Sequence, residues 1–310
     1  MNKKIKKILL KKNKSKILSL TAYSKNIAKI LDKYMDIVLV GDSMANVLYG
    51  HENTHKIKLE NIIQHTISVK MGIKKSLLVV DMPKGTYDNL KSAEKNVKLV
   101  IKKTRCDAVK IESNKKNYKI IEKLTKKKIA VMGHIGFTPQ FKRKFKVEGK
   151  TKLEASKLLK EAKLIQKAGA FSIVMECLSP ESAKLITKAL DIPTIGIGSS
   201  KYCDGQILVT DDMLGTSGFY PKFVKKYVNL NRVIEKAVKE YSRDVKLSKF
   251  PSTKNFKLSY FLDSFSKTLI NKFPIIFLFF SGSLIFFNLD KNNFEALTNL
   301  TLSLYFFLKI

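Results

Sequence analysis

The chain has 310 residues, a hydrophobic fraction of 45% and a formal net charge of +33. This length allows one barrel-sized domain or two smaller ones, and the composition excludes general disorder. A strong positive charge is typical of nucleic-acid-binding proteins, but only four of the 59 basic residues are arginine, and the lysines are spread along the chain. Because arginine dominates specific base and phosphate recognition, we expect no dedicated nucleic-acid site.

The cysteines and the N-terminus indicate the compartment. Cys106, Cys177 and Cys203 are scattered and form no CxxC motif. An odd, scattered set makes neither a disulfide framework nor a zinc site, so we expect a reducing, cytoplasmic environment. Residues 1–16 are basic but lack a long apolar core and a small-residue cleavage site. We interpret them as a solvated amphipathic lead-in and not as a signal peptide.

Short apolar runs alternate with amphipathic stretches over the first 230 residues. We predict strands over 17–23, 36–43, 76–83, 107–113, 129–136, 171–177, 193–200 and 206–213. Helix signals lie between them: Thr151 and Glu154 have capping-box spacing, and Ser179 precedes a proline at the first turn of another helix. Eight strands alternating with helices predict an α/β fold, a (β/α)8 TIM barrel.

A doubly wound open sheet is the competing architecture. Its GxGxxG fingerprint after the first strand is absent, and the nearest approach, Gly196–Ile197–Gly198, follows a late strand and lacks the third glycine. These glycines are better explained by tight backbone packing at a barrel rim. We therefore favour the barrel.

The composition changes after about residue 258. Eleven of the nineteen phenylalanines lie in the last fifty residues, and 273–289 carries no charge. As a helix this stretch would span roughly 25 Å, slightly less than a bilayer core of about 30 Å. We expect a catalytic barrel over 1–258 and a Phe-rich apolar extension over 259–310. A membrane anchor, an oligomer contact and an accidental extension remain open for the latter.

Two charged residues interrupt the apolar strand predicted over 107–113. Lys110 and Glu112 alternate with Val109 and Ile111, so their side chains point to the same face. Both faces of a parallel sheet are normally covered, and a buried charge needs a partner. An ordinary salt bridge would explain this pair if it stood alone.

Other predicted strands also end on polar residues. Asp42 lies beside Ser43, and Asp81, His134 and Glu176 each end another strand. A single carboxylate there is usually a helix cap, but the C-terminal ends of barrel strands meet at one mouth, where active sites lie.

Several carboxylates at one mouth favour a bound cation, and oxygen ligands favour Mg²⁺ over zinc. We therefore expect Mg²⁺ at the mouth, with Lys110 beside it anchoring the carboxylate of a small chelating 2-oxo acid. Its carbonyl would be polarised and its enolate stabilised.

Ten ordered runs over roughly residues 15 to 250 resemble the ketopantoate hydroxymethyltransferase family: TAYS, LVGDSMANVLYGHENT, LLVVDMPKGTY, VKIES, MGHIGFTPQ, KVEGKT, ECLSPESAKLIT, IPTIGIG, DGQILVTDDMLG and PKFVKKY. The resemblance implies a barrel of the phosphoenolpyruvate/pyruvate type that forms homo-oligomers, often decamers. It implies transfer of a hydroxymethyl group from 5,10-methylenetetrahydrofolate to 3-methyl-2-oxobutanoate, giving 2-dehydropantoate in pantothenate biosynthesis through a Mg-stabilised enolate.

The resemblance also implies roles for individual residues. Asp42 and Asp81 match the Mg²⁺-binding aspartates, with Glu112 as the third acidic group at the metal. Glu176 matches the catalytic acid/base. For His134, substrate contact and a structural role at the rim are equal alternatives. The residues expected to bind the 2-oxo acid are Asp42, Ser43, Asp81, Lys110 and His134.

Several loop residues depart from the family pattern. They are Lys84, Ser113, Asp211, the GIGSS run and the shortened basic loop Phe141–Phe145. These departures bear on folate binding and lid behaviour, but none is an expected metal, oxo-acid or acid/base residue, so we expect an active, divergent member. His51 is interpreted as shaping a loop, and His55 and His65 as surface or packing residues.

Two alternatives remain open. The first is another Mg-dependent 2-oxo-acid lyase or mutase of the same barrel superfamily. The second is a basic protein that associates with nucleic acid or, through the apolar extension, with membranes.

Overall fold

The computed structural model describes residues 2–114, 117–142, 145–218, 220–255, 275–280 and 283–288. The chain divides into two compact units, Met1–Asn231 and Arg232–Ile310. The first unit contains all eight strands of the barrel. The domain boundary predicted at residue 258 lies outside the described residues.

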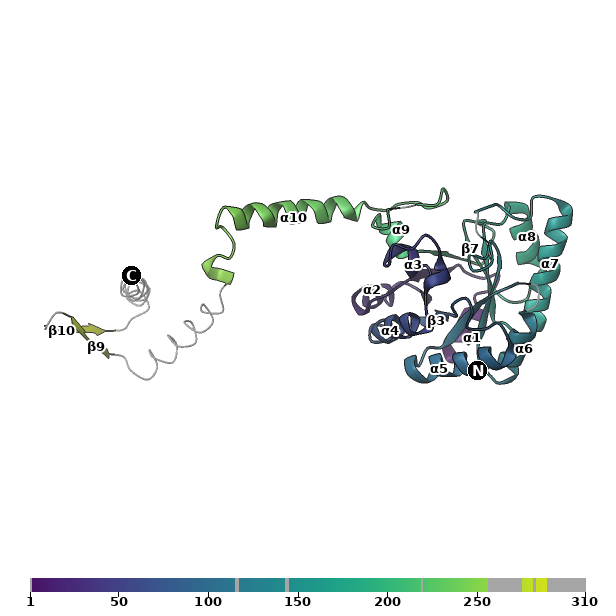
Figure 1. Ribbon diagram of the computed structural model, residues 1–310, viewed down its shortest axis with the longest axis horizontal. Coiled ribbons are helices and arrows are strands. Elements are labelled where there is room, and N and C mark those ends of the chain that lie inside the picture. The colour runs from purple at the N-terminus through teal and green to yellow at the C-terminus, as the bar shows by residue number, and fades with distance from the viewer. Residues whose placement is uncertain are drawn as a thin grey trace. The chain divides into compact units, whose positions relative to one another are not determined.

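The first unit is a closed barrel of eight parallel strands in chain order (Figure 1). The predicted TIM barrel is therefore confirmed and the open sheet excluded. The ring closes between the last and first strands, where Gly205 pairs with Ile17. A Cβ atom on Gly205 would lie 2.6 Å from the Ile17 carbonyl oxygen, so only glycine allows this approach. The strands are β1 Ile17–Thr21, β2 Ile37–Val40, β3 Leu77–Asp81, β4 Ala108–Glu112, β5 Val131–Gly136, β6 Ser172–Glu176, β7 Thr194–Ile197 and β8 Gly205–Leu208.

Helices surround the strands of the barrel unit (Figure 1). They form where apolar residues recur at helical spacing: in one of them Ala93, Val97, Val100 and Thr104 are buried. The α-helices among the described residues are α1 Lys3–Leu9, α2 Lys25–Leu31, α3 Met44–Val47, α4 Leu59–Lys70, α5 Leu90–Thr104, α6 Tyr118–Lys126, α7 Lys152–Lys167, α8 Pro180–Ala189, α9 Thr210–Leu214 and α10 Leu230–Lys246. The same residues include the 3₁₀ turns η1 Thr54–Lys56 and η2 Thr253–Asn255.

Both helix starts predicted from capping residues are confirmed. The Thr151 hydroxyl accepts the Glu154 backbone N–H at 3.2 Å, while the Glu154 carboxylate accepts the Thr151 N–H at 3.4 Å. The Ser179 hydroxyl accepts the Ser182 N–H at 3.3 Å at the start of α8. These bonds satisfy amide groups that have no partner within the helix.

The strand predicted over 206–213 is wrong in its second half. β8 ends at Leu208, and Thr210 begins the short helix α9. Thr210 bonds across to the end of β1, where its N–H donates to the Thr21 hydroxyl at 3.0 Å. This cross-link stops the extended chain and turns it into α9, which ends at Leu214 and is capped by Gly215 with a positive φ of 80°.

The N-terminal residues form an amphipathic segment as predicted, but the interpretation of this segment as a solvated lead-in is wrong. Ile5 and Ile8 of α1 are buried in one apolar cluster with Ile17, Ile37 and Leu77. The last three residues begin β1, β2 and β3. α1 therefore covers the N-terminal end of the barrel, opposite the mouth.

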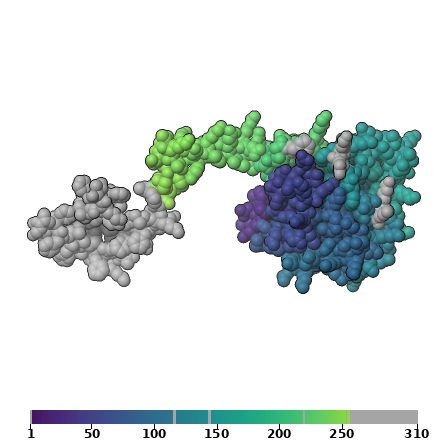
Figure 2. Space-filling model, in the orientation of Figure 1, coloured from purple at the N-terminus to yellow at the C-terminus, as the bar shows by residue number. Residues whose placement is uncertain are grey.

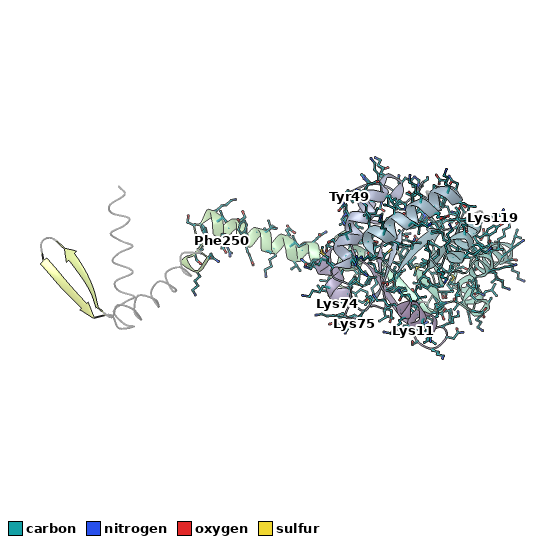
Figure 3. All side chains as sticks on the ribbon, turned by 90° about the horizontal axis from the view of Figure 1, so that it is seen from below. Lys11, Tyr49, Lys74, Lys75, Lys119 and Phe250 are labelled. Atoms are coloured by element: carbon teal, nitrogen blue, oxygen red, sulfur yellow. The ribbon has the colours of Figure 1, made fainter. Side chains whose placement is uncertain are left out.

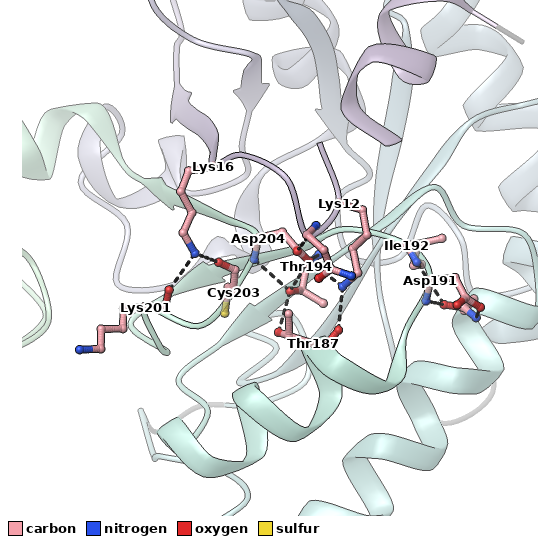
Figure 4. Close-up of polar contacts among 11 residues, drawn as sticks. Lys12, Lys16, Thr187, Asp191, Ile192, Thr194, Lys201, Cys203 and Asp204 are labelled. Carbon is pink, nitrogen blue, oxygen red and sulfur yellow. Dashed lines mark hydrogen bonds and ion pairs between the residues drawn. The ribbon is translucent and has the colours of Figure 1, made fainter. Parts of the chain in front are cut away.

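Asp204 joins this N-terminal segment to the last strands (Figure 4). Its buried carboxylate accepts Lys12 Nζ at 2.9 Å, the Asn13 N–H at 3.2 Å and the Thr194 N–H at 2.8 Å. Beside it, Lys16 Nζ donates to the Lys201 carbonyl at 2.9 Å. Residues before β1 thus help to hold β7 and β8 in the ring.

The surface of the barrel unit carries its positive charge in many places. In Figure 2 the visible face of the barrel unit bears residues coloured from purple to teal, so several parts of this unit's sequence contribute to it. The labelled Lys74 and Lys119 lie at opposite edges of the barrel unit in Figure 3. Lys11 is paired with Asp36 at 2.6 Å. The charge is therefore distributed around the unit, as the spread of lysines in the sequence predicts.

The apolar stretch 273–289 contains two short strands. β9 Ile275–Phe280 pairs antiparallel with β10 Ser283–Asn288. Across the described ranges, no helix combines the length and apolarity needed to cross a bilayer. The rest of the predicted extension 259–310 lies outside the described residues.

Candidate active site

The predicted site residues come together at the C-terminal end of the barrel. Asp81 pairs with Lys110 in the sheet, Glu112 pairs with His134, and Glu176 ends β6. The side chains from β3 to β6 are linked by close polar contacts, given below, and Asp42 and Ser43 lie just after β2. The expectation that the charged pair in β4 belongs to a larger cluster is confirmed by these positions.

An ion pair forms the centre of the cluster. Lys110 Nζ lies 2.6 Å from Asp81 Oδ1, and both side chains are buried. The other oxygen of Asp81 accepts the backbone N–H of Asp42 at 3.2 Å. Burial alone lowers the pKa of Lys110, but the charges of Asp81, Glu112 and Asp42 outweigh it and raise that pKa. The lysine is therefore held as a cation.

The carboxylates outnumber this cation. Burial, and then the charges of Asp81 and Glu112, raise the pKa of Asp42 well above its usual value. Burial raises the pKa of Glu112 to about 8, although Lys110 opposes the shift. Glu112 Oε1 is buried and has no hydrogen-bond partner. The cluster thus has more carboxyl groups than cations, and another cation would stabilise their ionised forms.

His134 and Glu176 form a second pair beside the lysine. His134 Nδ1 lies 3.3 Å from Lys110 Nζ, and its Nε2 lies 3.3 Å from Glu176 Oε2. An ammonium group can only donate, so Nδ1 accepts and the imidazole proton lies on Nε2, facing Glu176. Burial, together with Lys110, lowers the pKa of His134, and burial raises that of Glu176. The imidazole is therefore neutral.

The alternatives for His134 can be compared with this geometry. Its ring contacts the side chains of Lys110, Glu112 and Glu176, and Nδ1 lies 3.6 Å from Glu112 Oε1. All three are ionisable members of the cluster. Contact between His134 and a substrate stays a prediction.

Ser43 lies at the side of the cluster. Its hydroxyl shares a 2.8 Å hydrogen bond with Tyr23. A Cβ atom on the preceding Gly41 would lie 2.8 Å from Ser43 Oγ and 3.5 Å from Asp81 Oδ2. The glycine of the GDS run therefore makes room for the serine beside the aspartates.

Three uncharged residues at the mouth were missed by the sequence reasoning. Gln140 is buried, and its side chain donates a hydrogen bond to Asp42. Its backbone N–H donates to Glu112. Tyr87 donates its hydroxyl proton to Gln140, and Tyr23 bonds Ser43. All three lie in the TAYS, DMPKGTY and FTPQ runs. The runs were a usable signal, but uncharged side chains gave no reason to assign them a role.

The other histidines have mainly structural contacts. The backbone N–H of His51 donates to the Ala45 carbonyl at 2.8 Å, which shapes the loop after α3. His65 Nδ1 lies 2.8 Å from the Tyr23 carbonyl oxygen. His55 Nε2 lies 3.1 Å from the Pro139 carbonyl oxygen. Each of the three therefore holds a backbone group in place.

The residues that depart from the family pattern lie around the same end of the barrel. Lys84 is exposed after β3, and Ser113 is buried after β4, where its hydroxyl donates to Glu161. Asp211 is half-buried in α9, and burial raises its pKa. Of the loop 141–145, residues 143 and 144 lie outside the described ranges.

The raised pKa of Glu112 predicts a pH dependence of stability. The folded protein holds this proton more tightly than the unfolded chain, whose value is 4.5. The contribution is therefore present below about pH 4.5 and is lost as the pH rises through about 8. In metal-free protein we expect the free energy of unfolding to fall over this range, on the order of a few kcal/mol. Urea unfolding at several pH values with a chelator measures it.

The control for this prediction is Glu112→Gln, which removes the titrating group and keeps its shape. The variant should show a flatter dependence of stability on pH than the wild type. Equal slopes in the two proteins would contradict the assignment to Glu112.

Comparison with known proteins decides the family. A sequence model described as ketopantoate hydroxymethyltransferase matches residues 2–253. The chain belongs to this family. Its relatives named 3-methyl-2-oxobutanoate hydroxymethyltransferase include one from Pelagibacter ubique, 52% identical over 255 residues, which cover 82% of this chain and 99% of the relative. Another, from Clostridioides difficile, is 45% identical over 247 residues, or 77% and 90% of the two chains.

The family resemblance inferred from the ten runs is thus confirmed. A third relative of the same name, from Anaplasma marginale, is 44% identical over 247 residues, covering 79% of this chain and 89% of its own. Membership in the family makes the chain an enzyme of hydroxymethyl transfer in pantothenate biosynthesis. It favours this function over the lyase, mutase and nucleic-acid alternatives.

Solved structures confirm the fold. Phosphoenolpyruvate phosphomutase from Streptomyces platensis aligns with a TM-score of 0.55 at 10% identity, over 87% of this chain and 98% of its own. Phosphonopyruvate hydrolase in complex with oxalate and Mg²⁺ aligns with a TM-score of 0.53 at 11% identity, over 87% and 99%. Likeness at such low identity supports the barrel architecture alone.

Proposed function

We propose that the chain transfers a hydroxymethyl group from 5,10-methylenetetrahydrofolate to 3-methyl-2-oxobutanoate with Mg²⁺ held by Asp42 and Asp81. The observation that carries this proposal is the buried cluster of Asp42, Asp81, Lys110 and Glu112 at the barrel mouth. In this buried group the carboxyl groups outnumber the cation. Such a site can bind a small chelating anion only if a metal cation is also bound.

The donor set fits Mg²⁺. The side chains offer carboxylate oxygens, the ligands that Mg²⁺ prefers, and burial with mutual repulsion disfavours ionised Asp42 until a cation arrives. Within the part of the chain that the structure describes, no three acidic, histidine or cysteine side chains form a ready-made metal-binding group. Mg²⁺ is usually held by one or two carboxylates with waters and substrate oxygens, so two aspartates suffice. Glu112 would act as the third acidic group nearby.

Lys110 and Ser43 would bind the oxo acid. Bound Mg²⁺ would polarise the 2-oxo group and favour loss of the C3 proton. The Lys110 ammonium is held charged beside Asp81 and can donate to the substrate carboxylate. The hydroxyl of Ser43 shares a hydrogen bond with Tyr23 and would donate to a substrate oxygen when the Tyr23 hydroxyl donates to Ser43.

Glu176 would exchange protons with the substrate. Its Oε2 lies 3.3 Å from Nε2 of neutral His134. Burial raises the pKa of Glu176, which brings it closer to the value that suits an acid/base group at neutral pH. The Nε2–H of neutral His134 faces this carboxylate and would stabilise its ionised form.

The assembly and compartment expected for the chain remain part of the proposal. A homo-oligomer, often a decamer in the family, would bind the 2-oxo acid and the folate donor in the cytoplasm. The proposed donor is a small soluble co-substrate, which suits that compartment. Membrane contact through residues 259–310 stays a prediction.

A direct assay tests the reaction. Purified protein with 3-methyl-2-oxobutanoate and 5,10-methylenetetrahydrofolate should form tetrahydrofolate and 2-dehydropantoate when Mg²⁺ is present. Expression should also restore growth without pantothenate to a bacterial strain that lacks this step. Failure of both, with folded protein, would refute the proposal and favour a lyase or mutase activity.

Proton exchange separates the first chemical step from transfer. With 3-methyl-2-oxobutanoate and Mg²⁺ in D₂O, we expect the C3 hydrogen to exchange without the folate donor, because polarising the 2-oxo group acidifies that position. Proton NMR follows the loss of the C3 signal. Exchange should disappear in Asp81→Ala. Full turnover without any exchange, or exchange that survives removal of the metal, would contradict this order of steps.

A further inference from the structure

The residue that joins the most parts of the acidic cluster is uncharged. Gln140 is fully buried, with 0% of its surface exposed, and lies in the turn that follows β5. Its side-chain Nε2 donates to Asp42 Oδ2 at 2.8 Å and to the Met82 carbonyl at 3.0 Å. Its Oε1 accepts the hydroxyl proton of Tyr87. Both N–H bonds and the carbonyl of this amide are therefore used.

The backbone of the same residue holds a second acidic group. The Gln140 N–H donates to Glu112 Oε2 at 3.0 Å. Gln140 thus touches groups at the C-terminal ends of β2, β3 and β4 while it lies in the turn that follows β5. One residue connects four consecutive strand ends at the mouth.

These bonds determine which carboxylate oxygens remain available. Gln140 occupies Oδ2 of Asp42 and Oε2 of Glu112. Glu112 Oε1 is left buried and without a hydrogen-bond partner. A neutral donor is well suited to this position, because it binds two mutually repelling carboxylates without adding charge.

A histidine outside the cluster fixes the orientation of the peptide that makes the second bond. His55 Nε2 lies 3.1 Å from the carbonyl oxygen of Pro139, which belongs to the same peptide unit as the Gln140 N–H. A carbonyl can only accept, so Nε2 carries a proton. Lys84 Nζ lies 3.4 Å from Nδ1 and 3.5 Å from Nε2 of the same ring. The planar peptide is therefore held on one side by His55 and on the other by Glu112.

We propose that Gln140 is a positioning residue that sets the geometry of Asp42 and Glu112 for metal binding, and that His55 holds Gln140 in place. The metal-binding part of this inference rests on the proposed function. Outer partners of metal ligands fix the orientation of those ligands, and their loss typically reduces metal affinity about 10- to 100-fold. Gln140 acts through the carboxylates and makes no bond to the reacting atoms.

The test is isothermal titration calorimetry of Mg²⁺ into the full-length protein. Gln140→Met keeps the length of the side chain and removes its hydrogen bonds. Its dissociation constant for Mg²⁺ should rise about 10- to 100-fold. Gln166→Met is the matched control, because Gln166 bonds Asp191 away from the mouth, and it should bind Mg²⁺ like the wild type. Circular dichroism checks that each variant is folded.

Changes at His55 provide an independent arm. His55→Leu removes the donor to the Pro139 carbonyl and should weaken Mg²⁺ binding in the same direction by a smaller factor. His55→Gln retains an N–H donor and should restore most of the affinity. This pattern distinguishes positioning from a general effect on packing, which the two replacements would share.

The outcomes separate this inference from the proposed function. Wild-type protein that binds no Mg²⁺ would refute the metal role proposed above and this inference with it. Wild-type binding that is unchanged in folded Gln140→Met would refute this inference alone. If Gln140→Met does not fold, His55→Leu decides, and unchanged Mg²⁺ affinity in that variant would overturn the proposal.

Discussion

Replacing Asp81 with alanine is expected to lower kcat/KM for the oxo acid by about 10³-fold. The carboxylate contacts Lys110 at 2.6 Å and the Asp42 N–H at 3.2 Å, so its loss removes a proposed metal ligand and the partner of the buried cation. A metal acting as a Lewis acid supplies several kcal/mol, and about 4 kcal/mol corresponds to a 10³-fold change in rate. Steady-state assays with saturating donor measure the effect, and Asp42→Ala should behave similarly.

Two controls show whether the effect is local. Asp191→Ala removes an exposed carboxylate that bonds Gln166, and it should leave kcat/KM unchanged. Asp81→Asn keeps the shape of the side chain and should still lose most of the activity. Near-wild-type turnover of folded Asp81→Ala or Asp42→Ala would refute the metal assignment.

Replacing Lys110 with alanine should raise the KM for the oxo acid about 100-fold and change the KM for the folate donor little. The ammonium is proposed to bind the carboxylate of the oxo acid, and charge-assisted hydrogen bonds contribute roughly 1.5–3 kcal/mol, or about one to two powers of ten. Initial rates measured while each substrate is varied in turn separate the two constants. An equal rise in both KM values would contradict a specific carboxylate anchor.

The same substitution has a structural effect that must be measured. Asp81 loses its ion-pair partner, and a buried charge left alone costs about 3–5 kcal/mol unless it takes up a proton. Thermal unfolding of Lys110→Ala therefore accompanies the kinetics. Lys98→Ala, at an exposed lysine paired with Glu94 on α5, is the matched control and should alter neither KM nor stability.

The barrel could be predicted because the physical signal is local. Each strand is an apolar run, and helix starts such as Thr151 and Ser179 have a capping chemistry that neighbouring residues reveal. Errors arose where distant residues decide. Thr210 leaves the extended conformation because it bonds Thr21, 189 positions earlier. Ile5 and Ile8 are buried because three strand ends supply the surface that they cover, and periodicity alone cannot show that surface.

The charged part of the site could be predicted for a related reason. A charge in an apolar strand is costly, so Lys110 and Glu112 are conspicuous in the sequence, and the barrel rule places the ends of neighbouring strands together. Gln140 lies in a turn and His55 in the 3₁₀ turn η1, where polar residues are ordinary. Their importance depends on which peptide and which carboxylate oxygen they reach, and this information exists only in the folded chain.

The contacts of Asp204 have a consequence for how the chain is made. Lys12 and Asp204 are 192 positions apart, and β1 needs β8 as its second neighbour. At a synthesis rate of about 5–20 residues per second, the N-terminal segment emerges roughly 10 to 40 s before its last partners. During that interval one side of β1 is an unpaired edge, and such edges pair with strands of other chains. A ribosome that stalls before residue 204 therefore leaves a polypeptide that cannot close and is prone to aggregate.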